Sequence, residues 1–124
     1  MSKRVLIIED DRMLAEIWQL AFVKAGYAVE VLTDGGAAID WLNENPAPDA
    51  IVTDYSMPIH TGEDVLDHLN TIAPENKVVK VVITANHLAQ QGALGGKVDL
   101  LLVKPVRLAD MVSFVDRFLG VSAV

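Results

Sequence analysis

The sequence predicts an α/β fold, a doubly wound five-stranded parallel sheet with helices on both faces. Short apolar runs of strand length alternate with segments whose apolar residues recur at helical spacing, which is typical of repeated strand–helix units. Several runs are apolar almost throughout, as expected for strands that are buried on both faces of a parallel sheet. The length of 124 residues and the hydrophobic content of 52% suit a single domain over residues 1–124.

Five strand–helix units follow in order. The expected strands are residues 4–10, 27–34, 49–54, 77–85 and 98–105. The expected helices are residues 14–25, 35–45, 64–72, 86–97 and 107–120. Gly26 supplies a C-terminal stop for the first helix, and the prolines of NPAP end the second. The helix over residues 86–97 is expected to be poor because it contains three glycines.

Polar and charged side chains stand where four of these strands end. They are Glu9, Asp10 and Asp11 after the first strand, Asp54 after the third, Thr84 after the fourth and Lys104 after the fifth. With the strand order 2-1-3-4-5, the first and third strands flank the point where the order reverses. Open α/β sheets bind their ligands at that point, beyond the carboxyl ends of the strands.

Each of these residues alone has an ordinary structural explanation. Asp54 alone would be a turn residue or a helix cap, and Asp11 is expected to cap the first helix. Thr84 alone would be a β-branched strand residue, and Lys104 a solvated charge. Four such features at the same end of one sheet favour a common site instead.

The residue types narrow the chemistry of that site. Clustered carboxylates repel one another unless a cation neutralises them, and a set of oxygen ligands suits Mg²⁺. A carboxylate can also attack a phosphoryl group, while an ammonium and a hydroxyl stabilise the phosphoryl oxygens. The set therefore predicts acceptance of a phosphoryl group on Asp54, assisted by Thr84 and Lys104.

Composition excludes several other classes of function. The chain has no cysteine, so disulfides, thiolate zinc sites and thiol nucleophiles are ruled out. The formal net charge of -7, with scattered lysines and arginines, argues against nucleic-acid binding. No apolar run approaches the length that spans a membrane, and a cytoplasmic location is expected.

Five short motifs in order, VLIIEDD, TDYSMP, TGEDVL, ITA and LLVKP, resemble the receiver domain of two-component response regulators over nearly the whole chain. The resemblance, which is to the chemotaxis-regulator type, implies the flavodoxin-like (βα)5 fold. It also implies that Asp54 is the phosphoacceptor, Thr84 the switch hydroxyl and Lys104 the phosphate-pairing lysine, followed by a cis-bonded Pro105. The implied Mg²⁺ ligands are Glu9, Asp10, Asp54 and the backbone carbonyl of Ser56.

The same resemblance implies a function. Receivers are not enzymes in the usual sense: the aspartate takes its phosphoryl group from a phosphohistidine of a sensor histidine kinase or phosphotransfer protein, and the same site hydrolyses the product. A phosphorelay shuttle or a switch for a downstream protein target is expected, monomeric or weakly dimeric through the face of the fourth helix, fifth strand and fifth helix. Ser56 and Asn86 occupy the positions that tune hydrolysis. Leu101 replaces the usual Tyr or Phe three residues before the lysine, which puts the usual two-state coupling in question.

Three alternatives stay open. The first is a phosphate-independent docking receiver, which Leu101 favours. The second is a receiver excised from a longer regulator. The third is a small Mg²⁺-dependent phosphatase with an aspartate nucleophile, but that class carries a second Asp two residues later, where this chain has Ser56.

Overall fold

The protein forms one five-stranded parallel sheet with the strand order β2-β1-β3-β4-β5. The computed structural model describes residues 2–85 and 94–120. The strands are β1 (Arg4–Ile8), β2 (Ala28–Leu32), β3 (Ala50–Asp54), β4 (Val79–Thr84) and β5 (Leu100–Val103). The helices are α1 (Arg12–Lys24), α2 (Gly35–Glu44), α3 (Gly62–Ile72) and α5 (Leu108–Leu119). The predicted fold class and strand order are confirmed, whereas most of the helix predicted over residues 86–97 lies outside the described residues.

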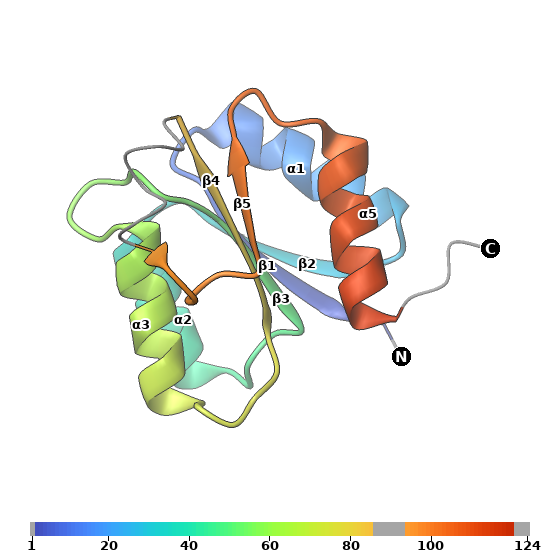
Figure 1. Ribbon diagram of the computed structural model, residues 1–124. Coiled ribbons are helices and arrows are strands. Elements are labelled where there is room, and N and C mark those ends of the chain that lie inside the picture. The colour runs from blue at the N-terminus through green and yellow to red at the C-terminus, as the bar shows by residue number, and fades with distance from the viewer. Residues whose placement is uncertain (1, 86–93, 121–124) are drawn as a thin grey trace.

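Helices cover both faces of this sheet. Figure 1 shows α1 and α5 on one face and α2 and α3 on the other. Val5 and Ile7 of β1 pack in one buried cluster with Trp18 and Phe22 of α1, while Leu6 packs on the opposite side. Because successive side chains of a strand point to opposite faces, both alternate sets must be apolar, and this explains the nearly continuous apolar runs.

The observed strands are shorter than the predicted apolar runs. β1 ends at Ile8 and not at residue 10, and β5 covers Leu100–Val103 and not residues 98–105. The paired register ends at these positions, although the amides of Glu9 and Lys104 still donate hydrogen bonds to Leu32 of β2 and Thr84 of β4. Glu9, Asp10 and Lys104 therefore directly follow the strands, at the carboxyl edge of the sheet.

Helix ends follow the capping chemistry of the sequence. The Asp11 side chain accepts a hydrogen bond from the Leu14 amide at 3.2 Å, which confirms its predicted role as the cap of α1. Helix α3 begins at Gly62, two residues before the predicted start, because Thr61 and Asp64 form a capping box. The Thr-x-x-Asp spacing was visible in the sequence and was sufficient to place this boundary.

Gly62 lies so close to the end of β3 that a side chain does not fit. A Cβ atom at this position would lie 2.7 Å from the Asp54 backbone oxygen. We predict that Gly62→Ala lowers the free energy of unfolding by about 1–3 kcal/mol, because helix and strand must move apart. Urea denaturation measures the effect. At Gly36, also in the first turn of a helix, the nearest atom is a carboxylate oxygen of Asp34 at 3.3 Å, so Gly36→Ala is the control and is expected to be nearly neutral. Equal losses in the two variants would contradict the close approach.

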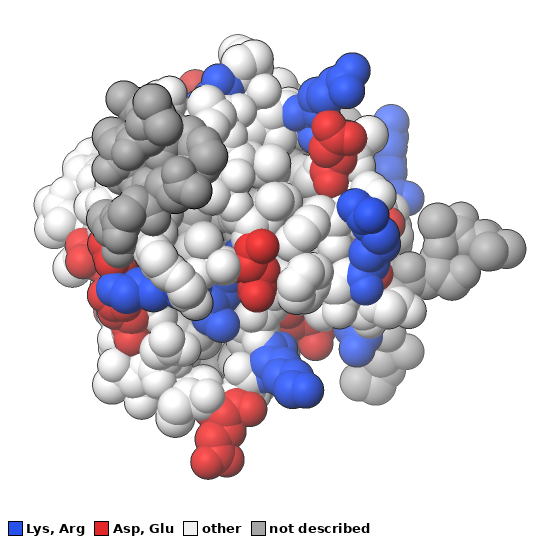
Figure 2. All heavy atoms as spheres, viewed as in Figure 1, with Lys and Arg blue, Asp and Glu red and all other residues white. Residues whose placement is uncertain are grey.

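The charged side chains do not gather into a basic surface on the face shown in Figure 2. Lysines and arginines on that face are separated by acidic and uncharged residues. Among the described residues, no helix has the length and apolar character needed to cross a lipid bilayer.

Candidate functional site

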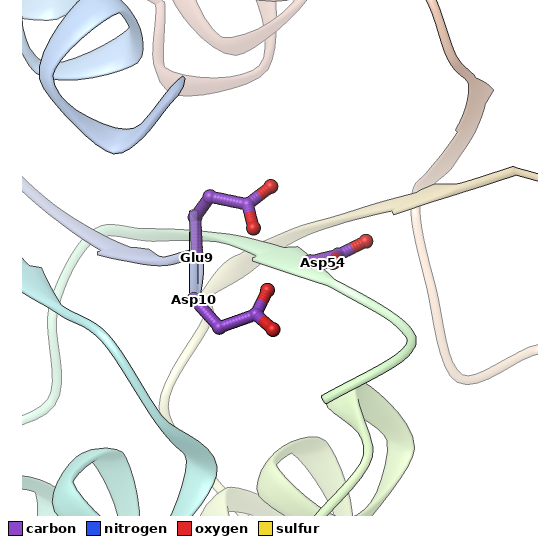
Figure 3. A group of neighbouring side chains, drawn as sticks. All are labelled: Glu9, Asp10 and Asp54. Atoms are coloured by element: carbon purple, nitrogen blue, oxygen red, sulfur yellow. The ribbon is translucent and has the colours of Figure 1, made fainter. Parts of the chain in front are cut away.

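Three carboxylates meet at the carboxyl edge of the sheet. Glu9 and Asp10 directly follow β1, Asp54 ends β3, and these two strands are neighbours in parallel register. The carboxylate oxygens that the three residues offer all lie within 4.8 Å of one another, and Figure 3 shows Glu9 and Asp10 extending from the end of β1 beside Asp54. The structure therefore brings together the acidic residues that the strand order predicted.

Burial changes the protonation of two of these acids. Glu9 is wholly buried and Asp54 is 5% exposed, whereas Asp10 is exposed. The pKa of Glu9 is raised to about 7, mainly by burial, with smaller upward contributions from its hydrogen bond to Asp10 and the charge of Asp54; the Asp11 amide and Lys104 act in the opposite direction. Burial also raises the pKa of Asp54, while the ammonium of Lys104 acts in the opposite direction. The ionised forms of Glu9 and Asp54 are therefore destabilised, and a bound cation would stabilise them.

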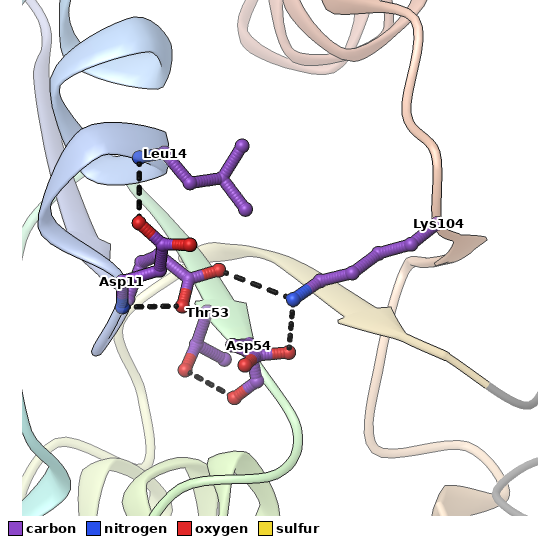
Figure 4. Close-up of polar contacts among 6 residues, drawn as sticks. Asp11, Leu14, Thr53, Asp54 and Lys104 are labelled. Carbon is purple, nitrogen blue, oxygen red and sulfur yellow. Dashed lines mark hydrogen bonds and ion pairs between the residues drawn. The ribbon is translucent and has the colours of Figure 1, made fainter.

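Lys104 supplies a positive charge to this cluster. Its Nζ lies 3.4 Å from Glu9 Oε1 and 3.4 Å from Asp54 Oδ1, and Figure 4 shows the side chain reaching from the end of β5 to both carboxylates. Burial lowers the pKa of Lys104, but the charges of Asp54 and Glu9 outweigh that effect, so the pKa lies above its ordinary value. The peptide bond to Pro105 is cis, as the resemblance implied.

The remaining predicted site residues occupy different surroundings. Thr84 ends β4, the strand beside β3, and is buried with 2% exposure. Ser56 is exposed, two residues after Asp54. Leu101 lies in β5 opposite Val82 and packs, half-buried, against the cluster on the α2 and α3 side. Asn86 lies outside the described residues. The functional roles assigned to these residues stay predictions.

Two residues that support the site were missed by the sequence reasoning. The Thr53 hydroxyl donates a hydrogen bond to the Asp54 backbone carbonyl at 2.9 Å, and Gly62 lets α3 approach the same carbonyl. Thr53 could have been singled out from the sequence, because it is a polar residue within an otherwise apolar strand. Gly62 had none, because only the three-dimensional packing shows what its missing side chain avoids.

The donor set fits Mg²⁺. The three acids provide only oxygen ligands, as a hard divalent cation requires, and the exposure of Asp10 leaves room for the water ligands that Mg²⁺ usually keeps. Glu9, Asp10 and Asp54 could hold the ion together, and its charge would favour the ionised form of the two buried acids, whose pKa values are raised mainly by burial.

The elevated pKa of Glu9 predicts a pH dependence of stability in the absence of divalent cations. Between pH 4.5 and about 7 the folded protein keeps a proton on Glu9 that the unfolded chain releases, so stability falls as the pH rises through this window. We expect the thermal midpoint, measured in EDTA, to decrease from pH 5 to pH 8 by more in the unsubstituted protein than in Glu9→Gln. Parallel pH profiles for the two proteins would contradict this assignment.

Comparison with known proteins identifies the family. The family model described as response regulator receiver domain matches residues 5–116. Among curated proteins, the chain is 33% identical over 120 residues to the transcriptional regulatory protein PrrA of Mycobacterium tuberculosis, an alignment that covers 95% of this chain and 50% of that protein. It is 28% identical to the DNA-binding transcriptional regulator NtrC of Azospirillum brasilense, over 94% of this chain and 24% of that protein. The chain thus spans half or less of the length of these relatives.

Solved structures show the same fold. The receiver domain of a sensor histidine kinase of Pseudomonas aeruginosa, with magnesium coordinated in its active-site cleft, superposes with a TM-score of 0.85 at 23% identity and covers 97% of this chain and 99% of that one. The response regulator TrrA of Thermotoga maritima, in complex with magnesium and beryllofluoride, superposes with a TM-score of 0.81 at 18% identity, covering 93% and 97%. Together with the family match, the fold and the acidic edge of the sheet show that this chain belongs to the response regulator receiver domain family.

Proposed function

We propose that the chain accepts a phosphoryl group on Asp54 from a phosphohistidine of a sensor histidine kinase or phosphotransfer protein. The observation that carries the proposal is the convergence of three carboxylates within 4.8 Å, with the Lys104 ammonium 3.4 Å from two of them. Receiver domains as a family are phosphoacceptors and not conventional enzymes. The proposal places the protein in the cytoplasm, as one receiver domain over residues 1–124, acting as a phosphorelay shuttle or as a switch for a downstream protein.

The residues divide the reaction between them. A carboxylate oxygen of Asp54 attacks the phosphorus atom, the bond from phosphorus to the donor imidazole nitrogen breaks, and that nitrogen keeps the electron pair. The Lys104 ammonium and the Thr84 hydroxyl stabilise the negative oxygens of the transferring group. Glu9, Asp10, Asp54 and the Ser56 backbone carbonyl would hold Mg²⁺, which when bound neutralises charge on the phosphoryl oxygens. In the same proposal, water attack on phosphorus at this site later releases phosphate, at a rate that Ser56 and Asn86 tune.

Intact mass measurement tests the proposal. The protein is incubated with acetyl phosphate and MgCl₂, and we expect a gain of one phosphoryl group that alkali removes. Asp54→Asn should show no gain. Asp34→Asn is the matched control, since Asp34 also follows a strand, but at the outer edge of the sheet where it caps α2. The assignment would be contradicted if Asp54→Asn gained a phosphoryl group, or if neither the unsubstituted protein nor Asp34→Asn did.

A second candidate function rests on Leu101. Its half-buried packing in β5 is that of an ordinary strand residue, and leucine at position 101 lacks the aromatic ring with a polar tip that could couple the site to the neighbouring surface. A docking receiver that works without phosphate would have this feature. Tryptophan fluorescence and intact mass distinguish the two functions. If MgCl₂ with beryllofluoride does not change the fluorescence and acetyl phosphate does not increase the mass, docking is favoured over phosphoryl transfer. Dimerisation through β5 and α5 is compatible with both functions, and sedimentation measures it.

A further inference from the structure

The loop between β3 and α3, residues 55–61, leaves the site and returns to it. It starts directly after Asp54 and ends at Gly62, whose amide donates a hydrogen bond to the Tyr55 carbonyl at 2.9 Å (the loop is visible in Figure 3 as the connection from Asp54 to α3). Within the loop, Met57 is buried. The loop is therefore closed at the end of β3, and Met57 fixes it to the core cluster on the side of α2 and α3. A side chain that it points outward stands at the carboxyl edge of the sheet, near the site.

Ile59 is such a side chain, and its backbone conformation is unfavourable. Its φ angle is +70°, and the amide of His60 donates to the Pro58 carbonyl at 2.7 Å, which makes Ile59 the central residue of a γ-turn. A positive φ is a genuine outlier for a β-branched residue, whereas glycine and asparagine tolerate it. Local backbone preference thus argues against isoleucine at this position.

Packing within the chain does not explain Ile59 either. Its side chain is 93% exposed, so it adds nothing to the core. Among the large hydrophobic residues that the structure describes, Ile59 and Met13 are the two most exposed, Met13 with 74%. Met13 lies in the first turn of α1, three residues after Asp10, and Ile59 lies five residues after Asp54. The two residues therefore follow the two groups of carboxylates closely in the chain.

We propose that Ile59 is a docking contact for the protein that donates the phosphoryl group, and that it contributes to the choice of donor. This inference rests on the proposed function. The Asp54 side chain is only 7% exposed, so a donor histidine reaches it only if the surface around that histidine covers the rim of the site. A downstream partner does not have to reach the Asp54 side chain, so its binding does not require contact with the rim of the site. The donor is expected to present apolar side chains beside its phosphohistidine, against which Ile59 becomes buried.

The test compares a protein donor with a small one. Purified histidine kinase cores from the source organism are autophosphorylated with ATP and mixed with the protein, and the core that transfers fastest is used; acetyl phosphate with MgCl₂ is the small donor. We expect Ile59→Asn to lower kcat/KM for transfer from the kinase by about tenfold or more, mainly through KM, because the buried contact is lost. Phosphorylation by acetyl phosphate should remain unchanged. Ile59→Leu, which restores an apolar side chain, should recover transfer.

Two controls separate docking from folding and from chemistry. Asparagine tolerates the γ-turn, so the thermal midpoint of Ile59→Asn should equal or exceed that of the unsubstituted protein. Ile72→Asn makes the same exchange at the C-terminal end of α3, away from the carboxyl edge, and should leave both donors unaffected.

Three outcomes would overturn the inference. They are unchanged transfer from the kinase to Ile59→Asn, a parallel loss with acetyl phosphate, and the failure of every kinase core to label a protein that acetyl phosphate does label. Failure of both donors would instead overturn the proposed function itself.

Discussion

Replacing Lys104 with methionine is expected to slow phosphorylation of Asp54 by acetyl phosphate about 100-fold, the usual effect of removing one preorganised charged donor from a reacting oxyanion. Methionine keeps the length of the side chain but removes the only ammonium that the described residues place beside Asp54. The same ammonium lies 3.4 Å from Glu9, so its loss also leaves two carboxylates without their partner. Initial rates from intact mass spectra at saturating MgCl₂ measure the effect.

Lys97→Met provides the matched control for this experiment. Lys97 also pairs with two carboxylates, those of Glu63 and Asp67, but both belong to α3 and neither belongs to the carboxyl cluster. Its replacement should leave the phosphorylation rate unchanged, because an exposed ion pair far from the reacting oxygen adds little. If Lys104→Met and Lys97→Met behaved alike, the electrostatic role of Lys104 would be wrong.

Phe22→Ala is expected to produce the largest loss of stability, about 3–5 kcal/mol in the free energy of unfolding. The Phe22 ring is fully buried between α1 and the sheet and meets the ring of Tyr27 edge to face, with a centroid distance of 5.6 Å. Removing the ring opens a cavity and also deprives Tyr27 of its aromatic partner. For a chain of this size such a loss lowers the thermal midpoint by about 10 °C or more.

Phe118→Ala is the comparison for this prediction. Phe118 is 54% exposed on α5 and contacts Phe114, so the same truncation there should cost about 1 kcal/mol. Chemical denaturation of both variants provides the measurement. A loss at Phe118 as large as the loss at Phe22 would show that burial against the sheet is not what stabilises α1.

The general plan of the site could be predicted from the sequence because it follows from topology. Parallel strands all end at the same edge, so Glu9, Asp10 and Asp54 are brought together by the strand order and need no detailed knowledge of side-chain packing. Lys104 was predictable for the same reason, as the residue after the last strand. The apolar runs indicated the strands because both faces of the sheet are buried.

Other properties depend on contacts that no local pattern shows. The burial of Glu9 and the resulting pKa of about 7 depend on how tightly the loops pack above β1. The need for glycine at position 62 depends on the approach of α3 to the Asp54 carbonyl. Ile59 was unpredictable for a different reason: its conformation runs against the preference of its residue type, so any reading of propensity gives the wrong answer there.

The division of the core into two clusters has a consequence for protein engineering. Val5 and Ile7 belong to the cluster beneath α1 and α5, whereas Leu6 and Leu101 belong to the cluster on the side of α2 and α3. The two sets of side chains are separated by the backbone of the sheet and share no member. Segments from related proteins could therefore be exchanged on one face and then on the other, with roughly additive effects, and a chimaera could acquire a new α1 surface while it keeps the packing around Leu101.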